Sequence, residues 1–144
     1  MKSFWGPFLF GIGMIGMLDG IILHQLLQWH SIYMHTNREG QIFSDGVFHL
    51  FVTIVIFIAG LLMWQDLSGG RKGSGYTFWG SFLLGAGSFN LAEGIINHHI
   101  LQIHHVRPFS PYSFTYDLSF DGLAILMLAI GWFIFKKGKR FASL

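Results

Sequence analysis

Side chains that could bind a metal ion are concentrated in the long apolar segments of this chain. Seven of the eight histidines and five of the seven acidic residues lie within or beside such segments. Imidazole and carboxylate groups together suit zinc, iron, manganese or Cu(II). The chain has no cysteine, so any metal site must use nitrogen and oxygen ligands. The predicted metal ligands are His24, His98, His49, Glu93, Asp19, Asp45, Asp121, His30 and His104.

The acidic residues have no basic partner in the same apolar segments. Asp19, Asp45, Glu93, Asp117 and Asp121 lie inside or at the rim of these segments, where no Lys or Arg occurs. An ionised carboxylate in hydrocarbon costs at least about 2.5–3.5 kcal/mol. We therefore expect these acids to be held by protons, by protonated histidines or by bound metal cations.

The spacing of two acid–histidine pairs leaves two arrangements open, a local distortion of the helix or two separate layers of polar residues. Asp19 and His24, like Glu93 and His98, are at positions i and i+5, which places them about 140° apart around an ideal α-helix. Both members of a pair can reach one centre only if the helix is kinked or contains a π-bulge, and a glycine directly follows each acid. Without such a distortion, the polar residues would form two separate layers.

Four transmembrane helices are the elements predicted to position these residues, over 4–29, 43–64, 78–103 and 116–135. Each is close to the roughly 20 residues needed to cross a bilayer. The 144 residues are 52% hydrophobic and only 11% charged, whereas soluble domains carry about 25% charge. This composition excludes a disordered chain and a basic nucleic-acid-binding protein. It predicts a single all-α integral membrane domain over residues 1–144.

The basic residues predict the orientation of this domain. Seven of the nine Lys and Arg residues lie at the N-terminus, in the turn 68–75 or at the C-terminus. The positive-inside rule then places both termini in the cytoplasm. Most of the candidate ligands fall in the outer leaflet, and His30 and His104 fall near the outer water, where a solvated histidine is the alternative to a ligand.

An internal duplication relates the two halves of the chain. Segment 4–30 aligns without gaps with segment 78–104, and more than half of the aligned positions are identical. The predicted fold is therefore a four-transmembrane-helix bundle of two parallel two-helix repeats, 4–66 and 78–138. In the second helix of each repeat, the dipeptide Asp45-Gly46 aligns with Asp121-Gly122, which leaves His49 without a counterpart.

Most of the candidate ligands lie in four segments: LDGIILHQLLQWH at 18–30, DGVFH at 45–49, FNLAEGIINH at 89–98 and HHV at 104–106. In these segments the sequence resembles a bacterial family of small four-helix membrane proteins, domain of unknown function 2243. The resemblance implies a location in the bacterial cytoplasmic (inner) membrane. Some members are fused to, or encoded near, CtaG-type cytochrome c oxidase assembly proteins, which implies copper or haem handling and respiratory oxidase assembly partners.

The leading interpretation is an integral membrane metalloprotein that binds one or two transition-metal ions, either zinc, iron or copper. With iron or copper it would be an oxidoreductase, and with zinc a hydrolase; no catalytic residue is assigned. One alternative is a haem b protein with His24 and His98 as axial ligands. Another is a proton or metal-ion carrier. The lipid bilayer is the expected partner and nucleic acid is not; the sequence leaves formation of a homodimer open.

Overall fold

The computed structural model describes residues 2–68 and 75–142, which are entirely helical apart from turns and loops. Helices α1 (Lys2–Asp19), α2 (Arg38–Ser68), α3 (Gly75–Glu93) and α4 (Ser113–Ala142) form a bundle. A π-helical turn follows each of the two central helices: η1 (Gly20–Leu26) after α1 and η2 (Gly94–Ile100) after α3. The predicted all-α class is confirmed for the described residues. The predicted turn 68–75 lies largely outside them.

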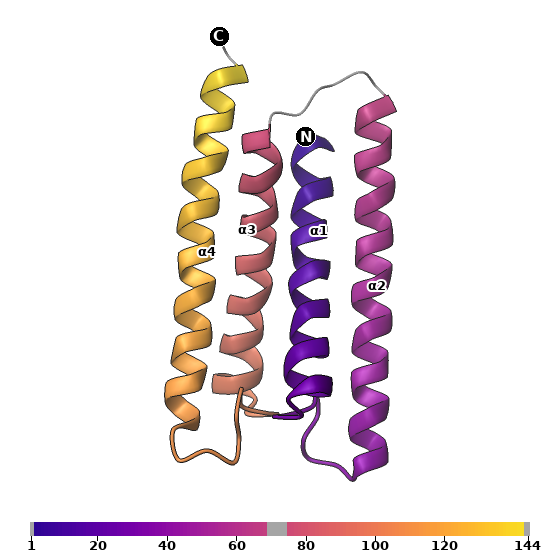
Figure 1. Ribbon diagram of the computed structural model, residues 1–144, viewed down its shortest axis with the longest axis vertical. Coiled ribbons are helices and arrows are strands. Elements are labelled where there is room, and N and C mark those ends of the chain that lie inside the picture. The colour runs from indigo at the N-terminus through magenta and orange to yellow at the C-terminus, as the bar shows by residue number, and fades with distance from the viewer. Residues whose placement is uncertain (1, 69–74, 143–144) are drawn as a thin grey trace.

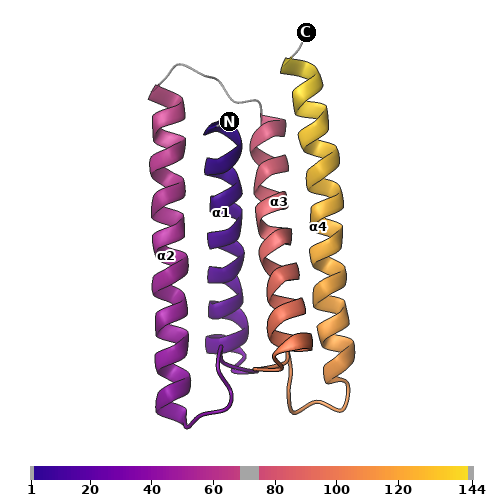
Figure 2. The ribbon, with the colours of Figure 1, turned by 180° about the vertical axis from the view of Figure 1, so that it is seen from behind.

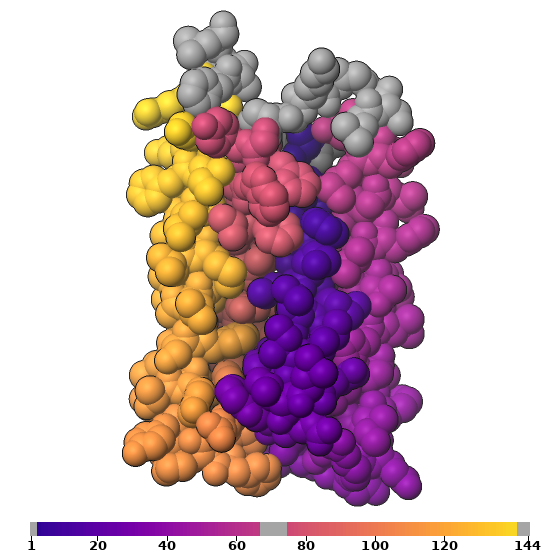
Figure 3. All heavy atoms as spheres, in the orientation of Figure 1, coloured from indigo at the N-terminus to yellow at the C-terminus, as the bar shows by residue number. Residues whose placement is uncertain are grey.

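The four helices stand side by side in the order α2, α1, α3, α4 (Figures 1 and 2). Helices α1 and α3 pack against each other, and each carries one outer helix, α2 or α4. The outer helices project many apolar side chains away from the bundle, along both flanks in Figure 3. The π-helical turns and the loops that follow them lie together at one end, opposite the start of α1 and the end of α4 (Figure 1).

Glycine allows the two central helices to approach closely. A Cβ atom on Gly11 would overlap the carbonyl oxygen of Phe82, and a Cβ atom on Gly85 would overlap the carbonyl oxygen of Phe8. Because these obstacles are backbone atoms, they cannot move aside as a flexible side chain can. Small residues are the usual means of close helix contact in membranes, so this seam fixes the separation of α1 and α3.

Contacts with the outer helices also recur in the two halves of the chain. Gly13 lies against the backbone of Val52 in α2, and Gly87 lies against the backbone of Ala124 in α4. Gly13 and Gly87 are equivalent in the alignment of 4–30 with 78–104. Their contacts therefore make Val52 in α2 equivalent to Ala124 in α4.

The alignment of Asp45 with Asp121 is therefore wrong. In the register that pairs Val52 with Ala124, Asp45 corresponds to Asp117 and His49 corresponds to Asp121. The packing agrees, since His49 lies against Gly20 and Asp121 against Gly94. The repeated Asp-Gly dipeptide is misleading because both of its glycines have open space where a side chain would be, so nothing in the packing requires glycine there.

Three helices are long and apolar enough to cross a membrane: Ser3–Leu26, Arg38–Asp66 and Ser113–Arg140. Helix α3 is less apolar because it contains several glycines, serines and a buried asparagine, and it lies between α1 and α4. The predicted spans 4–29 and 78–103 extend too far at their C-terminal ends. The α-helices end at Asp19 and Glu93, and the helical path ends with the π-helical turns.

Candidate metal centre

The π-helical turns bring each acid and its histidine to the same side of the chain. Hydrogen bonding from residue i to i+5 widens the turn, so residues five apart are no longer on different faces. Turn η1 begins immediately after Asp19 and contains His24, and η2 begins after Glu93 and contains His98. Of the two arrangements that the spacing leaves open, a distorted helix with one centre or two separate layers, the structure has the distorted helix after each acid.

A sharp reversal of the chain follows each π-helical turn. Gln28 and Gln102 adopt left-handed backbone conformations, with φ of 50° and 48°. The N–H of the next residue donates back over the turn, from Trp29 to the Leu23 carbonyl at 2.9 Å and from Ile103 to the Asn97 carbonyl at 2.9 Å. A left-handed residue followed by a bond back to the helix also ends a Schellman motif, but here the bond spans six residues instead of five. It turns the following histidine back toward the bundle.

His30 and His104 are buried as a result of this reversal. Only 4% of His30 and 2% of His104 is exposed. Both side chains are therefore enclosed by the protein instead of solvated, because the chain turns back and does not continue as a straight helix to either residue.

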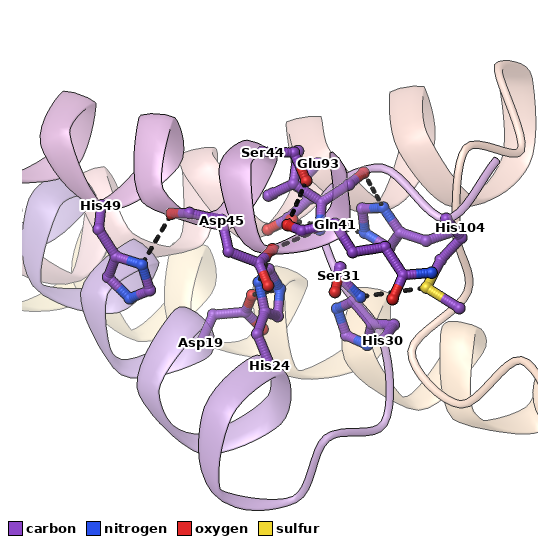
Figure 4. Close-up of polar contacts among 12 residues, drawn as sticks. Asp19, His24, His30, Ser31, Gln41, Ser44, Asp45, His49, Glu93 and His104 are labelled. Carbon is purple, nitrogen blue, oxygen red and sulfur yellow. Dashed lines mark hydrogen bonds and ion pairs between the residues drawn. The ribbon is translucent and has the colours of Figure 1, made fainter. Parts of the chain in front are cut away.

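The first candidate site consists of Asp19, His24 and His30, here called the Asp19 cluster (Figure 4). One ligand atom from each residue lies within 4.8 Å of the others. Asp19 Oδ2 is 3.1 Å from His24 Nε2. The His24 Nδ1–H donates to Asp45 Oδ1 at 3.0 Å, and the His30 Nδ1–H donates to the Val106 carbonyl at 2.8 Å. Both imidazoles therefore keep Nε2 available for a metal ion.

The second candidate site consists of Glu93, His98 and His104, here called the Glu93 cluster. The His104 Nδ1–H donates to the Ile32 carbonyl at 2.9 Å, and its Nε2 lies 3.7 Å from Glu93 Oε1. His98 Nδ1 lies 3.7 Å from Asp117 Oδ1, which is too far for a hydrogen bond. These distances between imidazole and carboxylate are longer than those around His24.

The two clusters are directly adjacent. The rings of His30 and His104 stack with centroids 4.6 Å apart and planes 8° apart. His24 packs on His30 at 4.5 Å, and His98 packs on His104 at 4.9 Å. Each loop also provides the backbone carbonyl that orients the histidine of the other loop. The four imidazoles therefore form one continuous group between two carboxylates.

Two further carboxylates, those of Asp45 and Asp117, accept hydrogen bonds from histidine side chains and from the backbone of the loops. Asp45 Oδ1 accepts the His24 hydrogen bond and also the backbone N–H of Ile32 at 2.8 Å. Asp117 accepts the backbone N–H of Val106 at 2.9 Å and the His105 Nδ1–H at 2.7 Å. Carboxylates and carbonyls behind histidines are typical of metal sites, where they fix the tautomer and orientation of the ring.

Several buried side-chain atoms of the two clusters have no hydrogen-bond partner: Asp19 Oδ2, His24 Nε2, Glu93 Oε2, His98 Nδ1 and His104 Nε2. Leaving a buried polar atom unpaired costs about 1–3 kcal/mol, and more for a charged group. The 3.1 Å approach of Asp19 Oδ2 to His24 Nε2 lacks hydrogen-bond geometry, yet about 3 Å is the separation of two ligands that each lie about 2 Å from one ion. The residues present therefore fit a metal ion.

The protonation of His30 agrees with a ligand role. His30 lies beyond the end of the candidate span Ser3–Leu26. Burial and the neighbouring His104 and His24 imidazoles lower the pKa of His30 to about 2. The imidazole is therefore neutral at pH 7, and with Nδ1 protonated it presents a lone pair at Nε2.

Three predicted ligands lie outside the two clusters. Asp45 instead supports His24. The His49 Nδ1–H donates to the Asp45 carbonyl at 2.8 Å, and its Nε2 is buried without a partner. Asp121 Oδ2 accepts from His99 at 2.7 Å, and its Oδ1 is buried without a partner. The six other predicted ligands form the clusters.

Sequence reasoning counted Asp117 among the acids but did not assign it to the site. It is 1% exposed and contacts both His105 and the loop that contains His104. The sequence offered no signal for this role, because the repeated Asp-Gly dipeptide paired Asp45 with Asp121 and the register that pairs Asp45 with Asp117 follows only from the packing. The carbonyls of Ile32 and Val106 had no signal either, because any residue type has a carbonyl group.

The fold and the clusters define a helical membrane protein with two buried groups of histidine and carboxylate that could hold metal ions. Residues 6–138 match the model of the family described as "Predicted membrane protein (DUF2243)". The chain belongs to this family. Comparisons with curated proteins and with solved structures find no match.

Proposed function

We propose that this protein is an integral membrane metalloprotein that binds two transition-metal ions, one at the Asp19 cluster and one at the Glu93 cluster. The observation that supports it most directly is the set of buried ligand atoms without hydrogen-bond partners in the two clusters. A pair of cations would stabilise these atoms and would balance carboxylates whose ion-pair partners in the described part of the chain are histidines.

The ligand set favours zinc or ferrous iron. Each cluster supplies two imidazoles and one carboxylate. This set is used by hydrolytic zinc enzymes and by non-haem iron oxygenases, in both cases with a coordination position left for water or substrate. Cu(I) suits the site less because thiolate ligands are absent. Bound metal would supply Lewis-acid or redox chemistry, and the outer carboxylates would orient its ligands.

The arrangement of the clusters favours small ions over haem. His30 and His104 fill the space next to His24 and His98, with ring centroids 4.5 to 4.9 Å apart. Axial ligation by His24 and His98 would require a porphyrin between rings that already pack through other imidazoles. A carrier is also less favoured, because both clusters lie at one end of the helices instead of forming a path along them (Figure 1).

We also infer the topology. The equivalent contacts of Gly13 with α2 and of Gly87 with α4 support two parallel two-helix repeats. Basic residues of α4 lie near its C-terminal end, opposite the clusters. The positive-inside rule therefore supports cytoplasmic termini and metal sites in the outer leaflet of a bacterial inner membrane.

Metal analysis of detergent-purified protein tests the proposal. Inductively coupled plasma mass spectrometry is expected to give two equivalents of metal for the parent protein and one for either His24→Ala or His98→Ala. The matched control is His35→Ala, because His35 is exposed and its Nε2 contacts only the Gln102 carbonyl, at 3.0 Å. No bound metal after reconstitution with zinc and iron would refute the proposal, and so would equal metal contents in all variants. A Soret band in the purified protein would favour haem instead.

A further inference from the structure

A cleft leads from the surface of the bundle to the Glu93 cluster. It has a volume of about 280 Å³ and lies between α2 and the α3–η2 segment. Phe48 and Phe51 line it from α2, and Phe89 and Ala92 line it from α3. Its other lining residues include the cluster residue Glu93. A larger cavity of about 630 Å³ lies near the opposite end of the helices, away from both clusters.

The mouth of the cleft faces the region that lipid would occupy. Phe51 is 53% exposed and Ile96 is 46% exposed, although both are apolar and lie in the helical part of the bundle. An exposed apolar surface on a membrane-embedded segment contacts hydrocarbon chains instead of water. A molecule that enters here therefore comes from the bilayer.

Two polar residues, Glu93 and Asn97, line the otherwise apolar cleft. Glu93 is 6% exposed, and its Oε2 is buried without a hydrogen-bond partner. The cleft therefore combines an apolar entrance with a carboxylate and an amide, which is the layout of a site for a molecule with an apolar chain and a small polar head.

The corresponding positions near the Asp19 cluster carry larger apolar residues. In the alignment of 4–30 with 78–104, Leu18 corresponds to Ala92 and Leu23 corresponds to Asn97. Leucine at both positions supplies more side-chain volume and no polar group. The two clusters thus differ in the residues that would admit a molecule from the side.

We propose that this cleft is the lateral entrance for a membrane-dissolved amphiphile, whose polar head binds the metal ion of the Glu93 cluster while its chain remains in the bilayer. The inference rests on the proposed metal function. A volume of about 280 Å³ lies near the lower limit of sites for small organic molecules. It accommodates a head and the first part of one chain, and the rest of the chain stays in lipid.

Binding of two hydroxamic acids tests this assignment. Hydroxamates coordinate metal ions directly, so decanohydroxamic acid serves as a chain-bearing probe and acetohydroxamic acid as a probe with the same head and no chain. The protein is loaded with Co²⁺ and placed in lipid nanodiscs, where the visible absorption of bound Co²⁺ reports coordination. Ala92→Phe fills the entrance at an exposed position that tolerates a larger side chain, and Leu18→Phe is the matched control on the other face.

Ala92→Phe is expected to weaken binding of decanohydroxamic acid about tenfold or more. It is expected to leave binding of acetohydroxamic acid and the Co²⁺ content unchanged. Leu18→Phe is expected to change none of these. Equal binding of the long probe to the parent protein and to Ala92→Phe, with full Co²⁺ content, would overturn the entrance alone. Absence of bound Co²⁺ in the parent protein would overturn the metal function and the entrance together.

Discussion

The Asp19 and Glu93 clusters use the same kinds of ligand but hold them differently. In the Asp19 cluster, the carboxylate lies 3.1 Å from His24, and Asp45 forms a 3.0 Å hydrogen bond behind that histidine. In the Glu93 cluster, the carboxylate–imidazole distance, from Glu93 to His104, is 3.7 Å. The first cluster is therefore arranged more tightly around its ligand atoms.

The difference arises from the residues behind each histidine. Asp45 serves His24 together with one backbone N–H. Asp117 instead accepts from His105 at 2.7 Å, and it lies 3.7 Å from His98. The counterpart of His105 in the first half of the chain is Ser31, so Asp45 has no equivalent competing imidazole.

This contrast resembles the difference between structural and catalytic metal sites. Structural sites are closed, whereas catalytic sites keep a position open for water or substrate. The Asp19 cluster has closer ligands and leucines at the flanking positions, and the Glu93 cluster borders a cleft. The two similar segments 4–30 and 78–104 thus differ more in the residues around the candidate ligands than in the candidate ligands themselves.

Loss of His30 is expected to have the largest effect, because it links the two clusters. His30→Ala removes a ligand from the Asp19 cluster. It also removes the hydrogen bond to the carbonyl of Val106, a residue whose backbone N–H donates to Asp117 beside the Glu93 cluster. We expect loss of one metal equivalent and about tenfold weaker binding of the other ion, the scale seen for lost supporting contacts. Chelator competition followed by mass spectrometry measures both quantities.

His24→Ala is the matched comparison for this prediction. Its Nδ1 donates to Asp45 within its own half of the chain, and its ring lies 6.4 Å from that of His104, against 4.6 Å for His30. The Glu93 cluster should therefore keep its parent affinity. If His30→Ala and His24→Ala had the same effect on the remaining ion, the two clusters would be independent despite the stacked rings.

Neutralising Asp45 or Asp117 is expected to lower metal affinity less than loss of His30 does, and by different amounts at the two clusters. Asp45→Asn removes the charge behind His24 at a hydrogen-bond distance of 3.0 Å. We expect zinc affinity at the Asp19 cluster to fall about 10- to 100-fold. Asp117→Asn should lower the affinity of the Glu93 cluster less, because His98 lies 3.7 Å from this carboxylate. Competition with a coloured zinc chelator measures both affinities.

Equal losses in these two variants would contradict the proposed difference in tightness. His35→Ala should leave both affinities unchanged, since this exposed side chain contacts the Gln102 carbonyl and the Tyr33 ring but no residue of either cluster. A larger loss for Asp117→Asn would show that its contacts with Val106 and His105 matter more than its distance from His98.

The sequence offered the local distortion of the central helices as one of two arrangements, but it gave no sign of the path of the chain beyond it. An acid, a glycine and a histidine at i, i+1 and i+5 are compatible with a common site only if the helix widens. The reversals at Gln28 and Gln102 lack a comparable signal, because glutamine rarely adopts φ near 50°. For this reason the sequence did not predict that His30 and His104 are buried within the protein.

The alignment of the outer helices shows a second limit of sequence reasoning. The matching Asp-Gly dipeptides at 45–46 and 121–122 favoured a register that pairs Asp45 with Asp121. The packing instead follows the register that pairs Val52 with Ala124, set by backbone contacts of α2 and α4 with glycines in the central helices. Such contacts depend on which face of α2 or α4 is turned inward. The shared Asp-Gly dipeptide does not indicate which face is turned inward, because a Cβ atom on either of its glycines would meet no other atom within 4 Å.

The smallest expected effect concerns the left-handed residues, where the two halves should behave alike. A left-handed conformation costs a residue other than glycine roughly 1–2 kcal/mol, and glycine loses about 0.5–1 kcal/mol through its greater freedom in the unfolded chain. Gln28→Gly and Gln102→Gly should therefore each raise the free energy of unfolding by about 0.5–1 kcal/mol, with unchanged metal content. Thermal unfolding in detergent, with metal content held equal, measures the shift.

Gln28→Val and Gln102→Val are the matched controls, because a β-branched residue is disfavoured most at positive φ. Both should lower the midpoint of thermal unfolding. Destabilisation by glycine at one position alone would show that the glutamine side chain there contributes a contact stronger than the strain it bears. The two halves would then differ in the loops that return His30 and His104 to the bundle, as well as in the supporting carboxylates.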